Sequence, residues 1–126
     1  CPKCKISYKP TESELLNAGF IELAATELTR GRGCHHCNQQ GYKGRIPVVE
    51  VLVISNEMRP IISKSGDSGQ LYAAARRNGM WTIYDDAREK IRHGLTTIDE
   101  AVSKLGVAPS DRKAALTEAS ELRKAS

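Results

Sequence analysis

Residues 33–54, GCHHCNQQGYKGRIPVVEVLVI, contain the two features that decide the fold. The stretch begins with a Cys-x-x-Cys pair followed by glycines, which permit tight backbone turns. It ends with a run at 46–54 that is rich in β-branched residues and carries Glu50 as its only charge. Such a run predicts a strand buried within a sheet. No comparable run exists elsewhere in the sequence, so we expect its hydrogen-bonding partners to precede Cys1.

The start of the chain repeats the Cys-x-x-Cys spacing, and the sequence holds four cysteines in all. The two-residue gap lets both sulfurs of a pair turn toward one ion, and two pairs supply the four thiolates of a tetrahedral Zn²⁺ site. We therefore predict a zinc site formed by Cys1, Cys4, Cys34 and Cys37. Four cysteines leave no open coordination position, so the predicted zinc is structural and not catalytic.

Basic residues close to the cysteines in sequence are expected to offset the negative charge of a zinc tetrathiolate. Among them, Arg45 is expected to brace the zinc loop, although a contact with a nucleotide or a neighbouring subunit stays open. His35 and His36 lie between two better-placed thiolates and are expected to be exposed. The basic residues are Lys3, Lys5, Arg30, Arg32, Lys43 and Arg45.

Three other interpretations of the cysteines stay open at this point. Two disulfides have three possible connectivities, but no secretory signal accompanies them. A dithiol redox site is disfavoured because neither pair opens a helix that follows a strand. A freestanding zinc-ribbon nucleic-acid-binding module would use the same basic residues. Tyr42 is the only aromatic residue interleaved with them, whereas single-strand binding relies on several stacking platforms.

Composition limits what the chain can do. It has 126 residues, of which 40% are hydrophobic, and a net charge of +4, so its core is thin and its charge gives little support for a nucleic-acid partner. No apolar run approaches the roughly 20 residues of a membrane helix. The motifs of P-loop, nucleophile-elbow, zincin and dinucleotide-binding sites are absent. We expect no complete active site in these residues.

Helix signals lie on both sides of the second cysteine pair. Thr11-Glu-Ser-Glu14 predicts a capped helix over 11–18. Four further helices are expected after the β-run, each with a capping residue at its start and a glycine near its end. A weak amphipathic helix or a frayed end is expected at 110–126. The four segments are Asn56 to Gly66, Ser68 to Gly79, Thr82 to Gly94 and Thr97 to Gly106.

The predicted fold is α+β and mostly helical. It consists of a zinc-binding subdomain at 1–45, a strand at 46–54, a bundle of short helices at 55–106 and a tail at 107–126. Because zinc would hold the first part together, loss of a ligand should unfold 1–45 more than the helices that follow.

The order of these features resembles the tetracysteine region of the hexameric ATPases of type II secretion and type IV pilus assembly. The resemblance covers about residues 1–106, with Ala87 in place of the usual glycine and Trp81 as an unusually large residue. Residues 107–126 match nothing in it. The matching positions are Cys1, Cys4, Gly33 to Cys37, Gly41 to Arg45, Val49-Glu50, Gly79-Met80, Thr82-Ile83, Asp86, Lys90, Gly94, Thr96-Thr97 and Glu100.

The resemblance implies a role that the isolated motifs do not. In that family the residues that bind ATP and Mg²⁺ precede the tetracysteine region, so here they would precede Cys1. The run at 46–54 would return into a RecA-like sheet, and the helices that follow would pack against a neighbouring subunit of the hexamer. The partners implied are those subunits and the inner-membrane platform proteins of a secretion or pilus machine, with neither a nucleic acid nor a membrane span. The location implied is the cytoplasm, peripheral to the inner membrane.

Overall fold

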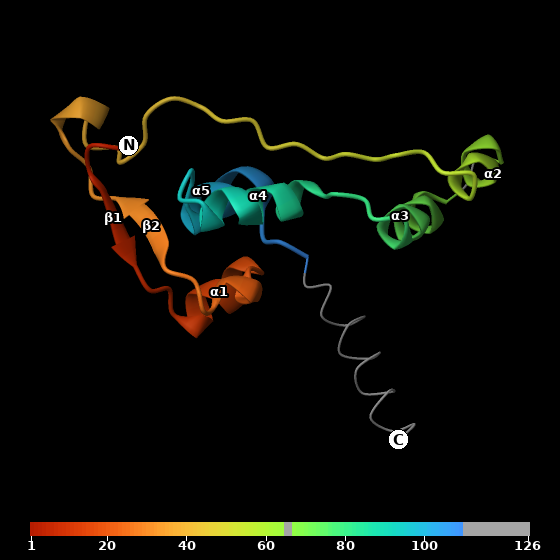
Figure 1. Ribbon diagram of the computed structural model, residues 1–126, viewed down its shortest axis with the longest axis horizontal. Coiled ribbons are helices and arrows are strands. Elements are labelled where there is room, and N and C mark those ends of the chain that lie inside the picture. Colours follow the sequence, from red (N-terminus) through yellow and green to blue (C-terminus); the bar gives the residue numbers. More distant parts are fainter. Residues whose placement is uncertain (65–66, 110–126) are drawn as a thin grey trace, which may run out of the picture.

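The computed structural model describes residues 1–64 and 67–109. The fold is α+β and mostly helical, as predicted (Figure 1). The tail at 110–126 and the expected helix end at Gly66 lie outside the described residues. In chain order the elements are β1 (Lys5–Tyr8), α1 (Glu12–Ala18), the 3₁₀ helix η1 (Ile21–Leu23), β2 (Leu28–Gly31), the 3₁₀ helix η2 (His35–Cys37), α2 (Met58–Ser63), α3 (Ser68–Arg77), α4 (Ile83–Arg92) and α5 (Ile98–Leu105).

β1 and β2 form a two-stranded antiparallel sheet that the sequence analysis did not predict. The register pairs Lys5 with Gly31 and Tyr8 with Leu28. Each strand has only four residues, which is too short for period-2 alternation to stand out from a loop. β1 leads from the first cysteine pair to α1, and β2 leads back to the second cysteine pair.

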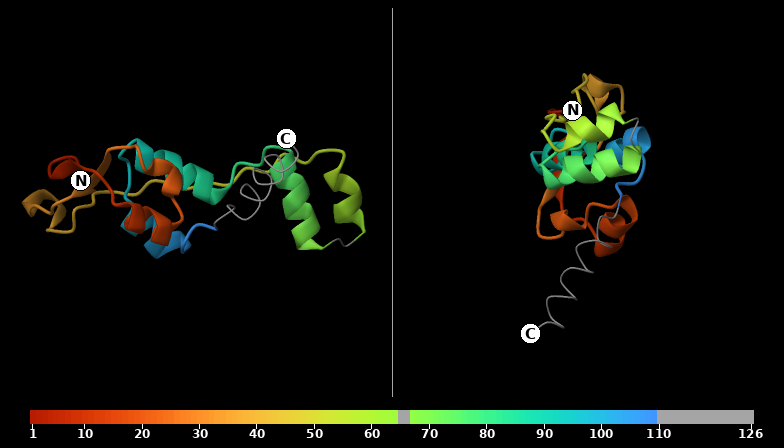
Figure 2. Two further views of the ribbon diagram at one scale, coloured as in Figure 1. Left: turned by 90° about the horizontal axis from the view of Figure 1, so that it is seen from below. Right: turned by 90° about the vertical axis from the view of Figure 1, so that its right-hand side faces the viewer.

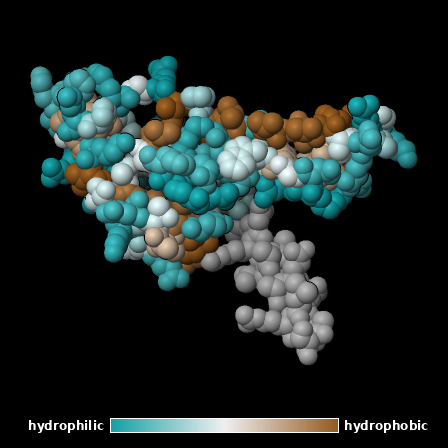
Figure 3. All heavy atoms as spheres, viewed as in Figure 1, coloured by the Kyte–Doolittle hydropathy of each residue, from teal (hydrophilic) through white to brown (hydrophobic). Residues whose placement is uncertain are grey.

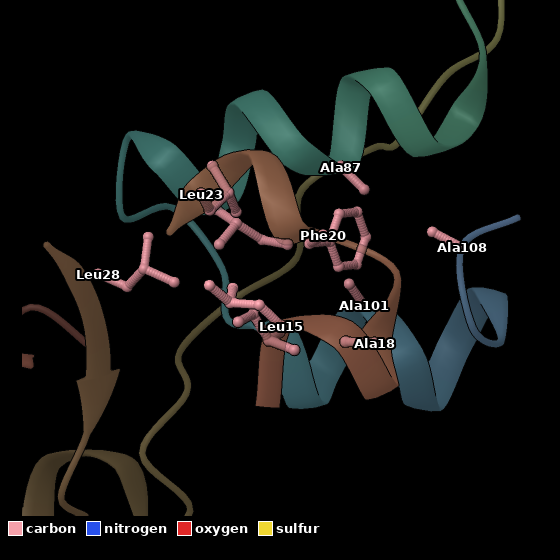
Figure 4. Packing of buried hydrophobic residues seen from close by; sticks show 10 residues of the cluster. Leu15, Ala18, Phe20, Leu23, Leu28, Ala87, Ala101 and Ala108 are labelled. Atoms are coloured by element: carbon pink, nitrogen blue, oxygen red, sulfur yellow. The ribbon is translucent and has the colours of Figure 1, made fainter. Parts of the chain in front are cut away.

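The main core joins two parts of the chain that are distant in sequence. Residues 15–28 supply its large side chains, and α4 and α5 supply the facing surface. Figure 4 shows the Phe20 ring lying among side chains from both parts. The zinc-binding subdomain expected at 1–45 therefore shares its core with the last two helices. The buried members are Leu15, Ala18, Phe20, Leu23, Leu28, Ala87, Ile91, Ile98, Ala101 and Ala108.

A second, smaller core lies between α2 and α3. Met58, Ala74 and Ala75 are buried there, with Ile61 and Leu71 packed against them. This helical hairpin stands apart from the main core, at the end of the molecule opposite the cysteines (Figures 1 and 2). Two extended passages of the chain connect it to the rest.

Most predicted helix boundaries are confirmed. Thr11, Thr82 and Thr97 each accept a hydrogen bond from a backbone N–H three residues later. The capping residues predicted for α2 and α3 are wrong, although α3 begins at Ser68 as predicted. Glu57, not Asn56, precedes α2, and it makes no side-chain cap. Asp67, not Ser68, caps α3, because its carboxylate accepts from the Gly69 N–H at 2.9 Å.

The segment at 46–54 is extended but does not form a strand ladder within the described residues. Its single bridge joins Val51 to Trp81, with N···O distances of 2.9 and 3.3 Å. Val48 packs against the main core, but the other large apolar side chains of the segment are exposed, up to 74% for Val53, and form a hydrophobic strip along the molecule (Figure 3). The predicted pairing within a larger sheet stays a prediction.

Two carboxylates fix the path of this segment against α4. Val49 donates its N–H to Asp86 at 2.8 Å, and Glu50 accepts from the Ile83 N–H at 3.3 Å. Within the described residues, the Glu50 carboxylate thus binds a backbone amide.

Neighbouring leucines of α1 provide a matched test of the main core. Leu15 is fully buried, whereas Leu16 is 48% exposed. We predict that Leu15→Ala lowers the free energy of unfolding by about 2–5 kcal/mol and Leu16→Ala by less than about 1 kcal/mol, measured by urea unfolding. Faster amide hydrogen exchange in α4 and α5 of the Leu15 variant, with α2 and α3 unaffected, would support a shared core. Similar losses for the two variants would contradict it.

Candidate metal centre

Antiparallel pairing brings the two cysteine pairs to one end of the sheet. Cys1 and Cys4 precede β1, and Cys34 and Cys37 follow β2, so all four lie beyond the Lys5–Gly31 end of the register. A hydrogen bond from the Arg32 N–H to the Cys4 carbonyl, at 3.1 Å, continues the pairing toward the cysteines. The two ends of the long segment between the cysteine pairs therefore lie side by side.

The four sulfur atoms lie within 4.8 Å of one another. The separations are 3.9 Å for Cys1–Cys34, 3.8 Å for Cys4–Cys37 and 3.7 Å for Cys34–Cys37. A tetrahedral ion with metal–sulfur bonds of about 2.3 Å requires edges of about 3.8 Å. The cluster therefore has the dimensions of a tetrathiolate metal site. All four cysteines are free thiols, so the disulfide interpretation has no support here.

Backbone amides aim at the sulfur of Cys37. The N–H groups of Cys34 and Gly41 each donate to it at 3.2 Å. Burial acts to raise the pKa of Cys37, but these amides outweigh it and lower the pKa to about 7. Burial raises the pKa of Cys4. One thiolate is thus favoured near neutral pH even before a positive ion approaches.

The loop that carries the second pair depends on a close backbone contact. A Cβ atom on Gly31 would lie 2.2 Å from the Gly41 carbonyl oxygen, so only glycine fits. Gly41 itself has φ +82° and faces the Gly31 backbone. The sequence predicts a turn at Gly41 but gives no sign of its contact with Gly31.

The histidines and basic residues near the cysteines in sequence differ in their contacts. His35 and His36 are exposed, as predicted. Lys5 and Lys43 donate to the Gly94 and His36 carbonyls at 2.6 and 3.3 Å. Arg45 is exposed and has no hydrogen bond or ion pair to any residue that the structure describes.

One side-chain bond ties the metal loop to the helices, and the sequence analysis missed it. The hydroxyl groups of Tyr42 and Thr97 lie 2.6 Å apart. Thr97 is also the N-cap of α5, where it accepts from the Glu100 N–H at 3.1 Å. Nothing in the local sequence pattern links these positions, because 55 residues separate them.

Acidic residues at the start of α4 form structural contacts. Burial alone would raise the pKa of Asp85, whose side chain is only 13% exposed. Thr82, Arg88 and Arg76 each donate to its carboxylate and together lower its pKa to about 2. Asp86 pairs with Lys90. An acid/base role is disfavoured, since Asp85 is ionised throughout the neutral range.

We predict that Asp85 makes folding sensitive to acid. Its pKa lies below the ordinary 3.8, so its contribution to stability is complete above pH 3.8 and is lost as the pH falls through about 2. Urea unfolding across this range should show a decline in the unfolding free energy, and Asp85→Asn should flatten it. An equally steep decline in that variant would place the acid sensitivity elsewhere.

Gly41 and Gly44 provide a matched test of the metal loop. Both have positive φ, but a Cβ on Gly41 would lie 2.8 Å from the Gly31 carbonyl oxygen, whereas Gly44 has nothing within 4 Å. We predict that Gly41→Ala weakens metal retention and lowers the thermal midpoint more than Gly44→Ala does. The measurements are metal content after dialysis and circular dichroism melting. Equal effects would mean that the close backbone contact is unimportant.

Comparison with known proteins identifies a family that shares this sequence. The family model described as "Type II/IV secretion system protein" matches residues 1–103. Type II secretion system protein E of Pseudomonas aeruginosa is 36% identical over 102 residues, which cover 81% of this chain and 20% of that protein. The type IV pilus assembly ATPase PilB of Thermus thermophilus is 34% identical over 106 residues, or 82% of this chain and 12% of that protein.

A third relative, the type II secretion system ATPase E of Vibrio cholerae, is 29% identical over 103 residues, or 81% of this chain and 20% of that protein. The chain thus spans a fifth or less of the curated relatives named here. Within the described residues, no helix is both long and apolar enough to cross a membrane. The family match extends across both cysteine pairs and the helices that share their core, and the chain therefore belongs to the type II/IV secretion system protein family, the secretion ATPases that its sequence resembles.

Proposed function

We propose that this chain is a zinc-stabilised structural and subunit-interaction module of a cytoplasmic hexameric ATPase that powers type II secretion or type IV pilus assembly. The observation that carries the proposal is the four-sulfur cluster, in a chain whose relatives include secretion and pilus ATPases. Its ligands are Cys1, Cys4, Cys34 and Cys37.

The donor set supports zinc. Four thiolates at tetrahedral spacing suit Zn²⁺ and leave no position for a water or a substrate. The ion would therefore supply folding free energy and no chemistry. Such a staple is needed at this end of the molecule, because Cys37 is the only buried hydrophobic residue among residues 29–57.

ATP and Mg²⁺ would bind in another part of the protein. The sequence has no P-loop motif, and the relatives are at least five times longer than the matched segment. The exposed strip at 46–54 fits the role of a strand added to a RecA-like sheet. Val49 and Val51 use their N–H groups toward Asp86 and Trp81, and the opposite edge has no backbone hydrogen bond within the described residues.

The remaining helices suit contacts with other proteins. The α2–α3 hairpin has its own core and leaves Ile62 and Tyr72 exposed. Neighbouring subunits of the hexamer and an inner-membrane platform protein are the partners we propose for this module.

Metal analysis of the purified chain tests the central claim. We predict one zinc ion per chain under reducing conditions, and its loss in Cys34→Ser. His35→Ser is the control, because His35 is exposed beside the same pair. Metal loss should destabilise residues 1–45 together with α4 and α5, because they share the main core. We therefore expect a smaller effect of metal loss only in α2 and α3, and not in all the helices beyond Asn56.

Hydrogen exchange locates the effect along the chain. Faster exchange in α4 and α5 of Cys34→Ser, with little change in α2 and α3, is the expected result. A wild-type chain that binds no zinc, or a Cys34→Ser variant that retains it, would refute the zinc assignment. A full-length parent protein that hydrolyses no ATP would refute the ATPase assignment.

A further inference from the structure

The charges of residues 1–49 are segregated along the sequence. Residues 10–29 contain acidic residues and no basic ones, whereas residues 1–9 and 30–49 contain basic residues and no acidic ones. The acidic members are Glu12, Glu14, Glu22 and Glu27. The basic members are Lys3, Lys5, Lys9, Arg30, Arg32, Lys43 and Arg45.

The β1–β2 sheet places these two groups at opposite ends of one subdomain. At the Lys5–Gly31 end lie the cysteines and most of the basic residues, which we call the metal end, residues 1–5 and 31–45. At the Tyr8–Leu28 end lie α1, η1 and all four acidic residues, which we call the α1 end, residues 8–28. Figure 1 shows α1 and η2 on opposite sides of the two strands. Lys9 is the one basic residue at the α1 end.

These charges are not neutralised where they lie. Every ion pair between two described residues falls within 57–104. Lys3, Arg32 and Arg45 are exposed, and their side chains have no hydrogen-bonding or ionic partner among the residues described. Lys5 and Lys43 donate only to neutral carbonyls. The helical part thus pairs its charges locally, and the first subdomain does not.

Most of the acidic residues at the α1 end are also exposed and without a charged partner among the described residues. Glu12, Glu22 and Glu27 are exposed and make no ion pair or side-chain hydrogen bond to any described residue. Glu14 accepts from the neutral Tyr8 hydroxyl at 2.8 Å and has no basic partner among the described residues. A zinc tetrathiolate would carry a charge of about −2, so five basic residues would leave the metal end positive.

We propose that the metal end of one copy of this chain contacts the α1 end of a second copy, head to tail. The proposal rests on the subunit-interaction role proposed above and names the surfaces used. A contact between two different surfaces of identical chains generates a ring when the rotation closes. Exposed ion pairs are individually weak, so their part is to orient the encounter and to reject wrong partners.

A second copy fits better than the other anionic partners of a basic surface. Nucleic acid or an anionic membrane would account for the metal end but leave the acidic α1 end unexplained. Tyr42 is the single aromatic residue among the basic ones, whereas single-strand binding relies on several stacking platforms.

Charge reversal provides the test, with the zinc-loaded chain studied by sedimentation equilibrium at about 0.01 M and about 1 M salt, where the screening lengths are about 30 and 3 Å. We expect self-association at low salt that is lost at high salt. Arg32→Glu/Arg45→Glu and Glu22→Lys/Glu27→Lys should each weaken it roughly tenfold or more. Mixing the two variants should restore association, because each then presents charges complementary to the other.

Arg59→Glu/Lys64→Glu is the matched control for the Arg32/Arg45 variant, since these exposed basic residues lie in and just after α2 and the net charge falls by the same amount. The control should associate as the wild type does. Absence of association at low salt, unchanged association in the reversed variants, or failure of the mixture to recover would overturn the proposal. Metal-end-dependent binding to a duplex oligonucleotide or to anionic phospholipid vesicles, without self-association, would also overturn it. Zinc content is measured in each sample, so failure of this proposal is distinguished from failure of the zinc assignment.

Discussion

The convergence of four cysteine sulfurs is the constraint on which the rest of the structure depends. At the metal end the chain has almost no buried apolar side chains, and its backbone is held by the contact between Gly31 and Gly41. Glycine makes this contact possible but does not stabilise it, because glycine loses more conformational entropy on folding than any other residue. The cluster is therefore what can keep the loop closed, and the Tyr42–Thr97 bond extends its influence to α5.

Local signals in the sequence were sufficient to single out the four cysteines that cluster and to predict most helices. A threonine cap at 11, 82 or 97 acts within three residues, and the Cys-x-x-Cys spacing acts within four, so both can be recognised without knowing the fold. The errors at α2 and α3 are of the same local kind. At the start of α3, two polar residues compete for one capping position, and Asp67 reaches the Gly69 N–H from one position earlier than Ser68.

Long-range features could not be predicted in this way. The β1–β2 sheet pairs two four-residue strands that are distant in sequence, and no local pattern marks their pairing. The main core is the clearest case, because Phe20 packs with Ala87 and Ala101 although some 70 residues of chain lie between them. Small alanines on α4 and α5 gave no hydrophobic signal as strong as that of 46–54, yet they are buried and that run is exposed. Burial here follows the availability of a partner more than the hydropathy of a segment.

This distinction explains why the molecule has two separate cores, which we expect to depend unequally on a bound metal. Residues 1–45 and the last two helices unfold as one unit if they share side chains such as Leu15 and Ile91, so a metal that holds the first also stabilises the second. The α2–α3 hairpin has a separate core. Among the described residues, the ion pair between Arg76 of α3 and Asp85 of α4 and the β-bridge between Val51 and Trp81 in the connecting segments join it to that unit. Its stability must come from these links, from its own few contacts, including the ion pair between Arg77 and Glu57, or from surfaces supplied by another protein. A hairpin placed in this way can bind a partner without disturbing the metal centre. The subunit-interaction role proposed above requires such an arrangement.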